Sequence, residues 1–208
     1  RDEATNKLEA CITGTPSTLR AHRHVLKTPI INFLCCSPRV RGRGLAPLLI
    51  DEISRRIYKR GIYNAIYTLT GVKHRPVAVV QWWHRSLNVK KLVEVGWIQL
   101  TSRETMQRTI RRYALPDRIQ MRLQRLTPDL CAPAHDLLKR YLKEIRITRQ
   151  FSREEFRHNF LPRDGVVDTY VRVDSSGKVV TELVSMYFIH MALLEKPKGH
   201  EGMKIACS

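Results

Sequence analysis

The sequence predicts a mixed α/β fold, in which helices pack against a sheet of mixed strand direction. Three observations predict it: a compact apolar run at residues 30–36, a helical stripe that begins at Leu45, and two apolar segments, 166–173 and 179–189, separated by a short polar turn. A strand, a glycine-containing loop, a helix and a further strand follow one another in the first half. This order indicates an α/β crossover between parallel strands.

The first strands are expected at residues 7–13, where polar and apolar residues alternate loosely, and at residues 30–36. The second run is apolar apart from Asn32, which is typical of a buried strand. The segment between them carries Arg20, Arg23 and Lys27. We expect it to be a polar, basic connection.

The first helix is expected to begin near Leu45, because apolar residues then recur with a helical period. Pro47 lies in the first turn, where a missing amide donor costs little, and Gly61 ends the helix. Residues 65–67 begin the next strand. The apolar stripe comprises Leu45, Leu49, Ile53 and Ile57.

The second half is expected to contain two helices and a hairpin. Residues 114–117 indicate a linker, and Ser152 and Glu155 form a capping box that starts the second helix. A turn at 162–165 precedes the hairpin, whose strands are joined at 175–177. The first of these helices is marked by Leu137, Leu138, Tyr141, Leu142 and Ile145. We therefore expect the fold to have two halves. The first half, residues 1–117, is largely present, and the second half, residues 118–208, is incomplete because no crossover helix follows the hairpin.

Composition limits the possible classes of binding partner but does not identify one of them. The 208 residues include 37 Lys plus Arg against 19 Asp plus Glu, a formal charge of +18, which attracts nucleic acid, anionic membranes and phosphate-rich cofactors alike. No segment approaches the roughly 18 apolar residues of a membrane span. The 5 cysteines show no C-x-x-C spacing and favour free thiols over a disulfide framework or a zinc site. We expect a cytoplasmic protein without a metal.

The most informative local motif joins the strand at 30–36 to the helix. Its residues are Arg41, Gly42, Arg43, Gly44, Leu45 and Ala46, with the spacing R-x-x-G-x-A. The first turn of a helix offers unpaired amide donors and a positive dipole end, and glycines allow close approach to a pyrophosphate. An ordinary basic turn is the alternative. The motif resembles the coenzyme A loop of the GCN5-related N-acyltransferase superfamily.

A narrower resemblance appears when the flanking blocks are taken together. They follow one another in the order of the protein N-myristoyltransferase family, from about Lys7 to Ser208, nearly the whole chain. The similarity implies an acyl-CoA N-acyltransferase fold and transfer of a myristoyl group from myristoyl-CoA to the N-terminal glycine of proteins. The blocks include residues 31–35, 46–50, 65–68, 82–88, 91–95, 105–109, 137–142 and 168–171.

The resemblance also implies roles for individual residues. Backbone amides of Phe33 and Leu34 would form an oxyanion hole for the thioester carbonyl. Thr68 would lie close to the reacting amine, and Trp82 and His84 would line the peptide groove. A core aromatic and a structural hydrogen bond are the respective alternatives for these last two residues. Coenzyme A would lie along Cys35, Cys36, Arg41, Gly42, Arg43, Gly44, Leu45 and Ala46.

The same resemblance implies partners. Myristoyl-CoA would be a co-substrate, no cofactor would be bound permanently, and peptides with an N-terminal glycine would be acceptors. We expect a monomer without specific nucleic-acid binding, and peripheral association with membranes or ribosomes through the basic surface. The family's base is a C-terminal carboxylate beyond the position matched by Ser208. Efficient turnover by this chain is therefore not expected.

Two other functions stay open at this point. A degenerate relative could bind acyl-CoA or a partner without catalysis. The missing base and the altered peptide groove favour it, since Trp82 takes a position that is commonly tyrosine and Ile189, His190 and Met191 replace a Leu-Pro-Ser segment. A basic nucleic-acid-binding module would also explain the charge. Against it, the aromatics are not interleaved for stacking, and no RNA-recognition signature occurs.

Overall fold

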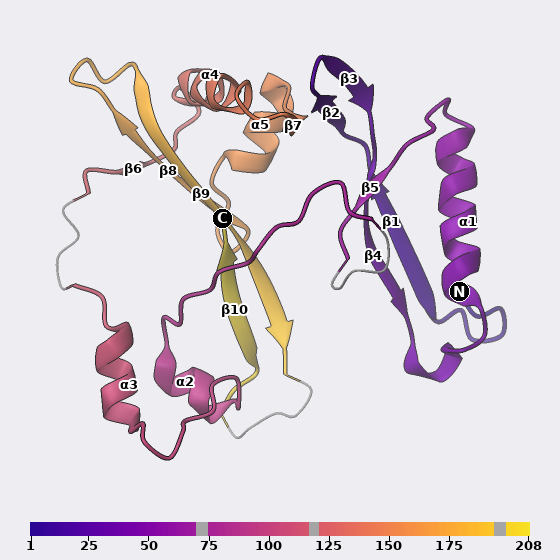
Figure 1. Ribbon diagram of the computed structural model, residues 1–208, viewed down its shortest axis with the longest axis horizontal. Coiled ribbons are helices and arrows are strands. Elements are labelled where there is room, and N and C mark those ends of the chain that lie inside the picture. The colour runs from indigo at the N-terminus through magenta and orange to yellow at the C-terminus, as the bar shows by residue number, and fades with distance from the viewer. Residues whose placement is uncertain (70–74, 117–120, 194–198) are drawn as a thin grey trace. The chain divides into compact units, whose positions relative to one another are not determined.

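The computed structural model describes residues 1–69, 75–116, 121–193 and 199–208 (Figure 1). By backbone contacts the chain divides into a first unit, Arg1–Pro76 with Lys139–Ser152, and a second unit, Val77–Leu138 with Arg153–Ser208. The expected division between residues 117 and 118 lies outside the described residues and stays a prediction.

The first unit contains a three-stranded sheet with the order β1-β4-β5. β4 pairs antiparallel with β1 and parallel with β5, and α1 connects the two parallel strands (Figure 1). The predicted crossover is therefore confirmed, although the first strand begins three residues later than expected. The elements are β1 (Ala10–Thr15), β4 (Ile30–Cys36), α1 (Leu45–Tyr58) and β5 (Ile66–Tyr67).

α1 packs with its predicted apolar stripe turned inward, since all four stripe residues are partly buried while most others are exposed. A Cβ atom at Gly14 would lie 3.3 Å from the Ile31 side chain and 3.5 Å from that of Ile53, so glycine permits the close approach of α1 to the sheet. At the other end, Gly61 has a φ of 71° and the Ile62 amide donates to the Ile57 carbonyl at 3.3 Å. This is the glycine-terminated helix end that the sequence predicts.

The strand expected at residues 30–36 is confirmed, but the expectation that it is buried is wrong, since its residues are partly buried or exposed. Phe33 is 72% exposed and Leu34 is 44% exposed. β5 pairs only with the first two residues of β4, and the exposed residues 32–35 lie beyond that pair. An apolar run alone does not distinguish a strand covered on both faces from one covered on a single face.

The polar, basic connection between the first two predicted strands contains a hairpin that the sequence did not predict. Residues Thr18–Ala21 (β2) and His24–Lys27 (β3) form a hairpin, which pairs with β7 (Ile147–Gln150) in the order β3-β2-β7. β3 is exposed along its whole length, so its sequence lacks the alternation that marks a half-buried strand. Arg20 fastens β2 to the segment before β7 by donating to the carbonyls of Leu142 and Ile145 at 2.5 and 2.6 Å.

The second unit contains a four-stranded antiparallel sheet with the order β10-β9-β8-β6. The predicted α5 and the predicted hairpin are confirmed, whereas the helix expected around residues 137–145 begins at Cys131 and ends at Leu142. α2, α3, β6 and β10 were not predicted. The elements are α2 (Val89–Glu94), α3 (Met106–Tyr113), β6 (Gln124–Arg125), α5 (Arg153–Phe160), β8 (Val167–Val173), β9 (Val180–Ala192), β10 (Gly202–Cys207) and the part of α4 (Cys131–Leu142) that precedes Lys139.

The core of this unit forms where α5 packs on β8. Phe156 is fully buried, with its ring 5.3 Å from His135 and 4.6 Å from Phe160. Beneath it, the buried Thr169 hydroxyl shares a hydrogen bond of 2.7 Å with Ser185. None of the helices in the described ranges has the length and apolarity that a membrane crossing requires.

Candidate functional site

A bulge in β4 interrupts its pairing with β1. Thr13 lies opposite Asn32 and Cys11 opposite Cys35, so Phe33 and Leu34 have no partner in the register of either ladder. Phe33 has a φ of 54°, a region that non-glycine residues seldom adopt and that costs about 1 to 3 kcal/mol. Strain of this size persists where surrounding contacts fix the backbone.

Two side chains of β1 hold the bulge in place. The Thr13 hydroxyl donates to the Asn32 carbonyl at 3.0 Å, and the Cys11 thiol donates to the Phe33 carbonyl at 3.4 Å. With these carbonyls engaged by β1, the amide groups of Phe33 and Leu34 remain outside the paired register. Bulges next to binding sites commonly re-aim backbone groups in this way.

The loop that follows β4 presents a row of amide donors. Gly42 and Gly44 have φ values of 77° and 74°, and Gly44 is the N-cap of α1 without a side-chain cap. The first intrahelical bond runs from the Leu48 amide to the Gly44 carbonyl at 3.3 Å, and Pro47 has no amide proton. Within the described part of the chain, the amides of residues 42–46 therefore donate to no protein acceptor. Such a row at a helix start suits an anion.

The arginines beside this loop differ in their engagement. Arg39 pairs with Glu9 at 2.6 Å, and the Nε of Arg41 donates to the Cys36 carbonyl at 3.3 Å. Arg43 is exposed and makes no ion pair or side-chain hydrogen bond among the described residues. Arg41 and Arg43 thus keep charges without an ion pair among the described residues, and Arg43 also has its whole guanidinium available to a ligand.

Thr68 lies at the same end of the sheet as the bulge. Ile30 pairs with Ile66 and Ile31 with Tyr67 in the parallel ladder, so Thr68 follows at the level of Asn32. Ligands of α/β proteins bind at the carboxyl ends of parallel strands; β5 ends here, whereas β4 continues past the bulge to Cys36. The first unit therefore brings together Phe33, Leu34, Thr68, the exposed thiol of Cys35, the partly buried Cys36 and the loop from Arg41 to Ala46.

The two predicted peptide-groove residues belong to the second unit. Trp82 and His84 lie in a segment without helix or strand, and both are exposed. With 66% of its surface accessible, Trp82 is not a core aromatic of this unit. The bulge, the loop from Arg41 to Ala46 and Thr68 therefore all belong to the first unit.

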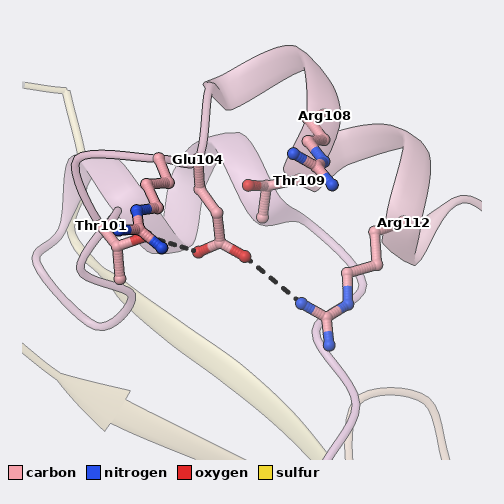
Figure 2. A pocket seen from close by; sticks show the side chains of 6 residues that line it. Thr101, Glu104, Arg108, Thr109 and Arg112 are labelled. Carbon is pink, nitrogen blue, oxygen red and sulfur yellow. Dashed lines mark hydrogen bonds and ion pairs between the residues drawn. The ribbon is translucent and has the colours of Figure 1, made fainter.

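The second unit carries a separate hollow of about 610 Å³ at the start of α3, which contains none of the predicted site residues. Figure 2 shows Glu104 between Thr101, whose hydroxyl donates to it at 3.4 Å, and Arg112, which pairs with it at 3.3 Å. Three arginines and one glutamate give the lining a formal charge of +2. The lining residues are Thr101, Arg103, Glu104, Arg108, Thr109 and Arg112.

Comparison with known proteins decides the family. Residues 94–208, more than half of the chain, match the model of the myristoyl-CoA:protein N-myristoyltransferase C-terminal domain, and residues 1–80 match that of the N-terminal domain. This chain belongs to the N-myristoyltransferase family. The predicted family resemblance is thereby confirmed.

Individual N-myristoyltransferases agree with this membership. The chain is 41% identical to the glycylpeptide N-tetradecanoyltransferase of Drosophila melanogaster and 37% identical to glycylpeptide N-tetradecanoyltransferase 2 of Bos taurus, over all of this chain but 44% and 42% of those proteins. A crystal structure of Saccharomyces cerevisiae N-myristoyltransferase with bound myristoyl-CoA matches with a TM-score of 0.92 and 32% identity, over 99% of this chain and 50% of that one. The chain thus spans about half the length of the relatives it matches.

This agreement confirms the predicted mixed α/β fold and its acyl-CoA N-acyltransferase class. The individual site residues of this N-myristoyltransferase chain stay predictions. Sequence reasoning missed Cys11 and Thr13, which support the bulge, because the register between β1 and β4 cannot be read from either strand alone. It also missed the hollow at α3, whose only sequence signal is the pair of arginines at positions 108 and 112, one helical turn apart.

Proposed function

We propose that this protein transfers a myristoyl group from myristoyl-CoA to the N-terminal glycine of other proteins. The observation that supports this most directly is the juxtaposition of the β4 bulge with the amide-rich loop at the start of α1. A thioester and a pyrophosphate are the two polar parts of an acyl-CoA, and this end of β4 offers donors for each. The bound myristoyl-CoA of the Saccharomyces cerevisiae relative agrees with this choice of ligand.

In the proposed reaction, the neutral amine nitrogen attacks the thioester carbonyl carbon and the C–N bond forms. The C–S bond breaks, coenzyme A leaves as the thiolate, and the proton lost from nitrogen passes to a base or to water. Negative charge develops on the carbonyl oxygen, where the amides of Phe33 and Leu34 would donate. Preorganised donors of this kind contribute about 3 kcal/mol each. The hydrogen bonds from Thr13 and Cys11 hold the strained φ of Phe33, so the bulge is formed before the substrate arrives.

The phosphates would lie on the loop. The amides of residues 42–46 and the dipole of α1 favour an anion, and Arg43 adds a full positive charge. The cysteines at the end of β4, Cys35 and Cys36, would lie along the pantetheine between the thioester and the phosphates. This arrangement would hold the thioester at a fixed distance from the helix start.

The acceptor amine must lose a proton before it can react. An α-amino group has a pKa of about 7.7 to 8.0 and is largely protonated near neutral pH. Only the neutral amine attacks, so a base must remove a proton. The Thr68 hydroxyl would accept a hydrogen bond from the amine and orient it. Trp82 and His84 would contact the peptide that carries the glycine.

The remaining expectations are part of the same proposal. The protein would act in the cytoplasm as a monomer, modify other proteins by lipidation, and reach membranes or ribosomes through its basic surface. The net charge of +18 supports weak, salt-sensitive attraction to such polyanions. This attraction depends on net charge and requires no specific nucleic-acid site.

Titration calorimetry with coenzyme A and with myristoyl-CoA tests the proposal. We expect both ligands to bind, with affinity that falls as salt rises, and myristoyl-CoA to bind more tightly because its acyl chain adds apolar contact. Transfer to a glycine-initiated peptide is then followed by mass spectrometry under single-turnover conditions, which detect transfer even where turnover is inefficient. Absence of coenzyme A binding together with tight RNA binding would contradict the proposed function and favour the nucleic-acid alternative.

A further inference from the structure

Two thiols face each other across the first ladder of the protein. Cys11 of β1 and Cys35 of β4 are direct partners in the antiparallel register, next to the bulge. Opposed residues in such ladders have Cα atoms about 4.5 or 5.5 Å apart, depending on the pair type. Disulfides join Cα atoms about 4.4 to 6.8 Å apart, so either pair type falls within reach. Opposed side chains also project from the same face of a sheet.

The other cysteines are not placed in this way. All 5 cysteines are free and lie in described residues. Cys36 is opposite Ala10, so no thiol faces it across the ladder. Cys131 is buried in α4, and Cys207 is opposite Tyr187 at the end of β10 in the second unit. The ladder therefore selects one pair.

The two thiols of the pair differ in accessibility. Cys35 is exposed, whereas Cys11 is partly buried and its thiol donates to the Phe33 carbonyl at 3.4 Å. We propose that Cys11 and Cys35 are an oxidative modification site, at which a hydroperoxide drives formation of an intramolecular disulfide. Exposure assigns the first reaction to Cys35 and the second to Cys11.

The chemistry balances with hydrogen peroxide as the oxidant. The Cys35 thiolate attacks one peroxide oxygen and the O–O bond breaks, which gives a sulfenic acid and, after proton transfer, one water. Cys11 then attacks the Cys35 sulfur, the S–S bond forms and the S–O bond breaks, and the leaving hydroxide takes the Cys11 proton as a second water. Two thiols are oxidised and one peroxide is reduced. A dithiol reductant reverses the bond by thiol–disulfide exchange.

The disulfide would act on the bulge. Phe33 and Leu34 lie between Asn32 and Cys35, and oxidation removes the thiol proton that Cys11 donates to the Phe33 carbonyl. The crosslink also fixes one end of the bulge to β1. If the proposed function holds, this changes the orientation of the donors that would bind the thioester, and oxidation lowers acyl-CoA affinity.

Peptide mapping of the peroxide-treated chain without reduction tests the modification directly. We expect a crosslink between the tryptic peptides 8–20 and 28–39, which contain Cys11 and Cys35. Dithiothreitol should remove it, Cys11→Ser should abolish it, and Cys36→Ser should retain it. The proposal is overturned by a Cys35–Cys36 bond, by a bond between two chains, or by oxidation of Cys35 to the sulfinic acid in the presence of Cys11.

Acyl-CoA titration of the reduced and oxidised chain tests the consequence separately. We expect about a tenfold loss of affinity on oxidation, the effect of one lost hydrogen bond, and recovery of the affinity when dithiothreitol reduces the disulfide. An unchanged affinity in a fully crosslinked chain overturns the regulatory role. A reduced chain that binds no acyl-CoA contradicts the proposed function instead, and the crosslink is then judged by mapping alone.

Discussion

Ile31 of β4 pairs in parallel with Tyr67 of β5, and this pairing places Thr68 beside the bulge at Phe33 and Leu34. β5 has only two residues in the ladder, so the register of that short pair determines which side chain follows at the sheet edge. β4 continues beyond this pair to Cys36, and the loop from Arg41 to Ala46 follows it. The bulge therefore lies between the level of Thr68 and the loop along β4.

Replacing Thr68 by valine should separate binding from transfer. The substitution keeps the shape and removes the hydroxyl, so we expect transfer to a glycine-initiated peptide to slow about tenfold, with unchanged acyl-CoA affinity. Thr15→Val, at an exposed position at the end of β1, is the matched control and should leave both unchanged. Equal losses in affinity and rate would argue that Thr68 acts on the fold.

The glycine at the start of α1 should matter more for ligand binding than the glycine at its end. Gly44→Ala and Gly61→Ala each place a side chain at a φ near +70° with open space around it, and each should cost about 1 kcal/mol of folding stability. Only Gly44→Ala disturbs the amides of residues 42–46. We expect coenzyme A affinity to fall in this variant and to stay unchanged in Gly61→Ala, measured by calorimetry beside chemical denaturation of both.

The ion pairs of α1 predict a pH-dependent stability. Hydrogen bonds from Arg55 and Arg56 lower the pKa of Glu52 to about 2, from an ordinary value of 4.5. Because the folded-state pKa is depressed, the contribution of Glu52 is complete above pH 4.5 and is lost as the pH falls toward 2. Glu52→Gln should flatten this part of the stability profile, and raised salt should weaken it in the unchanged protein. A profile identical in both chains would contradict the prediction.

The core of the second unit should depend on Phe156. Phe156→Ala removes a fully buried ring and should lower the free energy of unfolding by about 3 to 5 kcal/mol. Phe33→Ala removes a ring that is 72% exposed and should cost far less. Chemical denaturation of the two variants compares them, and similar losses would mean that the ring of Phe33 packs more tightly than its exposure indicates.

Sequence patterns predicted the elements whose residues repeat with a clear period. The stripe from Leu45 to Ile57, the capping box at Ser152 and the hairpin after Gly165 all correspond to observed elements. β2 and β3 were missed because an exposed hairpin has no apolar alternation, and α3 was missed because its residues are mostly polar and basic. Local hydrophobic patterns in the sequence reflect burial, so they do not reveal elements that have little buried surface.

The candidate site was predicted through family resemblance more than through physics. Gly42 and Gly44 are readable as residues for positive φ, and both adopt it. The positive φ of Phe33 is not readable, because nothing in an aromatic residue favours that conformation. Its cause is the register between two strands, which also places Cys11 opposite Cys35. Long-range register of this kind does not follow from either strand by itself.

The most direct test of the proposed site is the response of backbone amide resonances to ligand. On addition of coenzyme A we expect the amide signals of Gly42, Arg43, Gly44, Leu45 and Ala46 to shift, and on addition of myristoyl-CoA those of Phe33 and Leu34 to shift as well. Shifts confined to the hollow around Arg108 and Arg112, or unchanged signals at Phe33 and Leu34 with saturating myristoyl-CoA, would contradict the account.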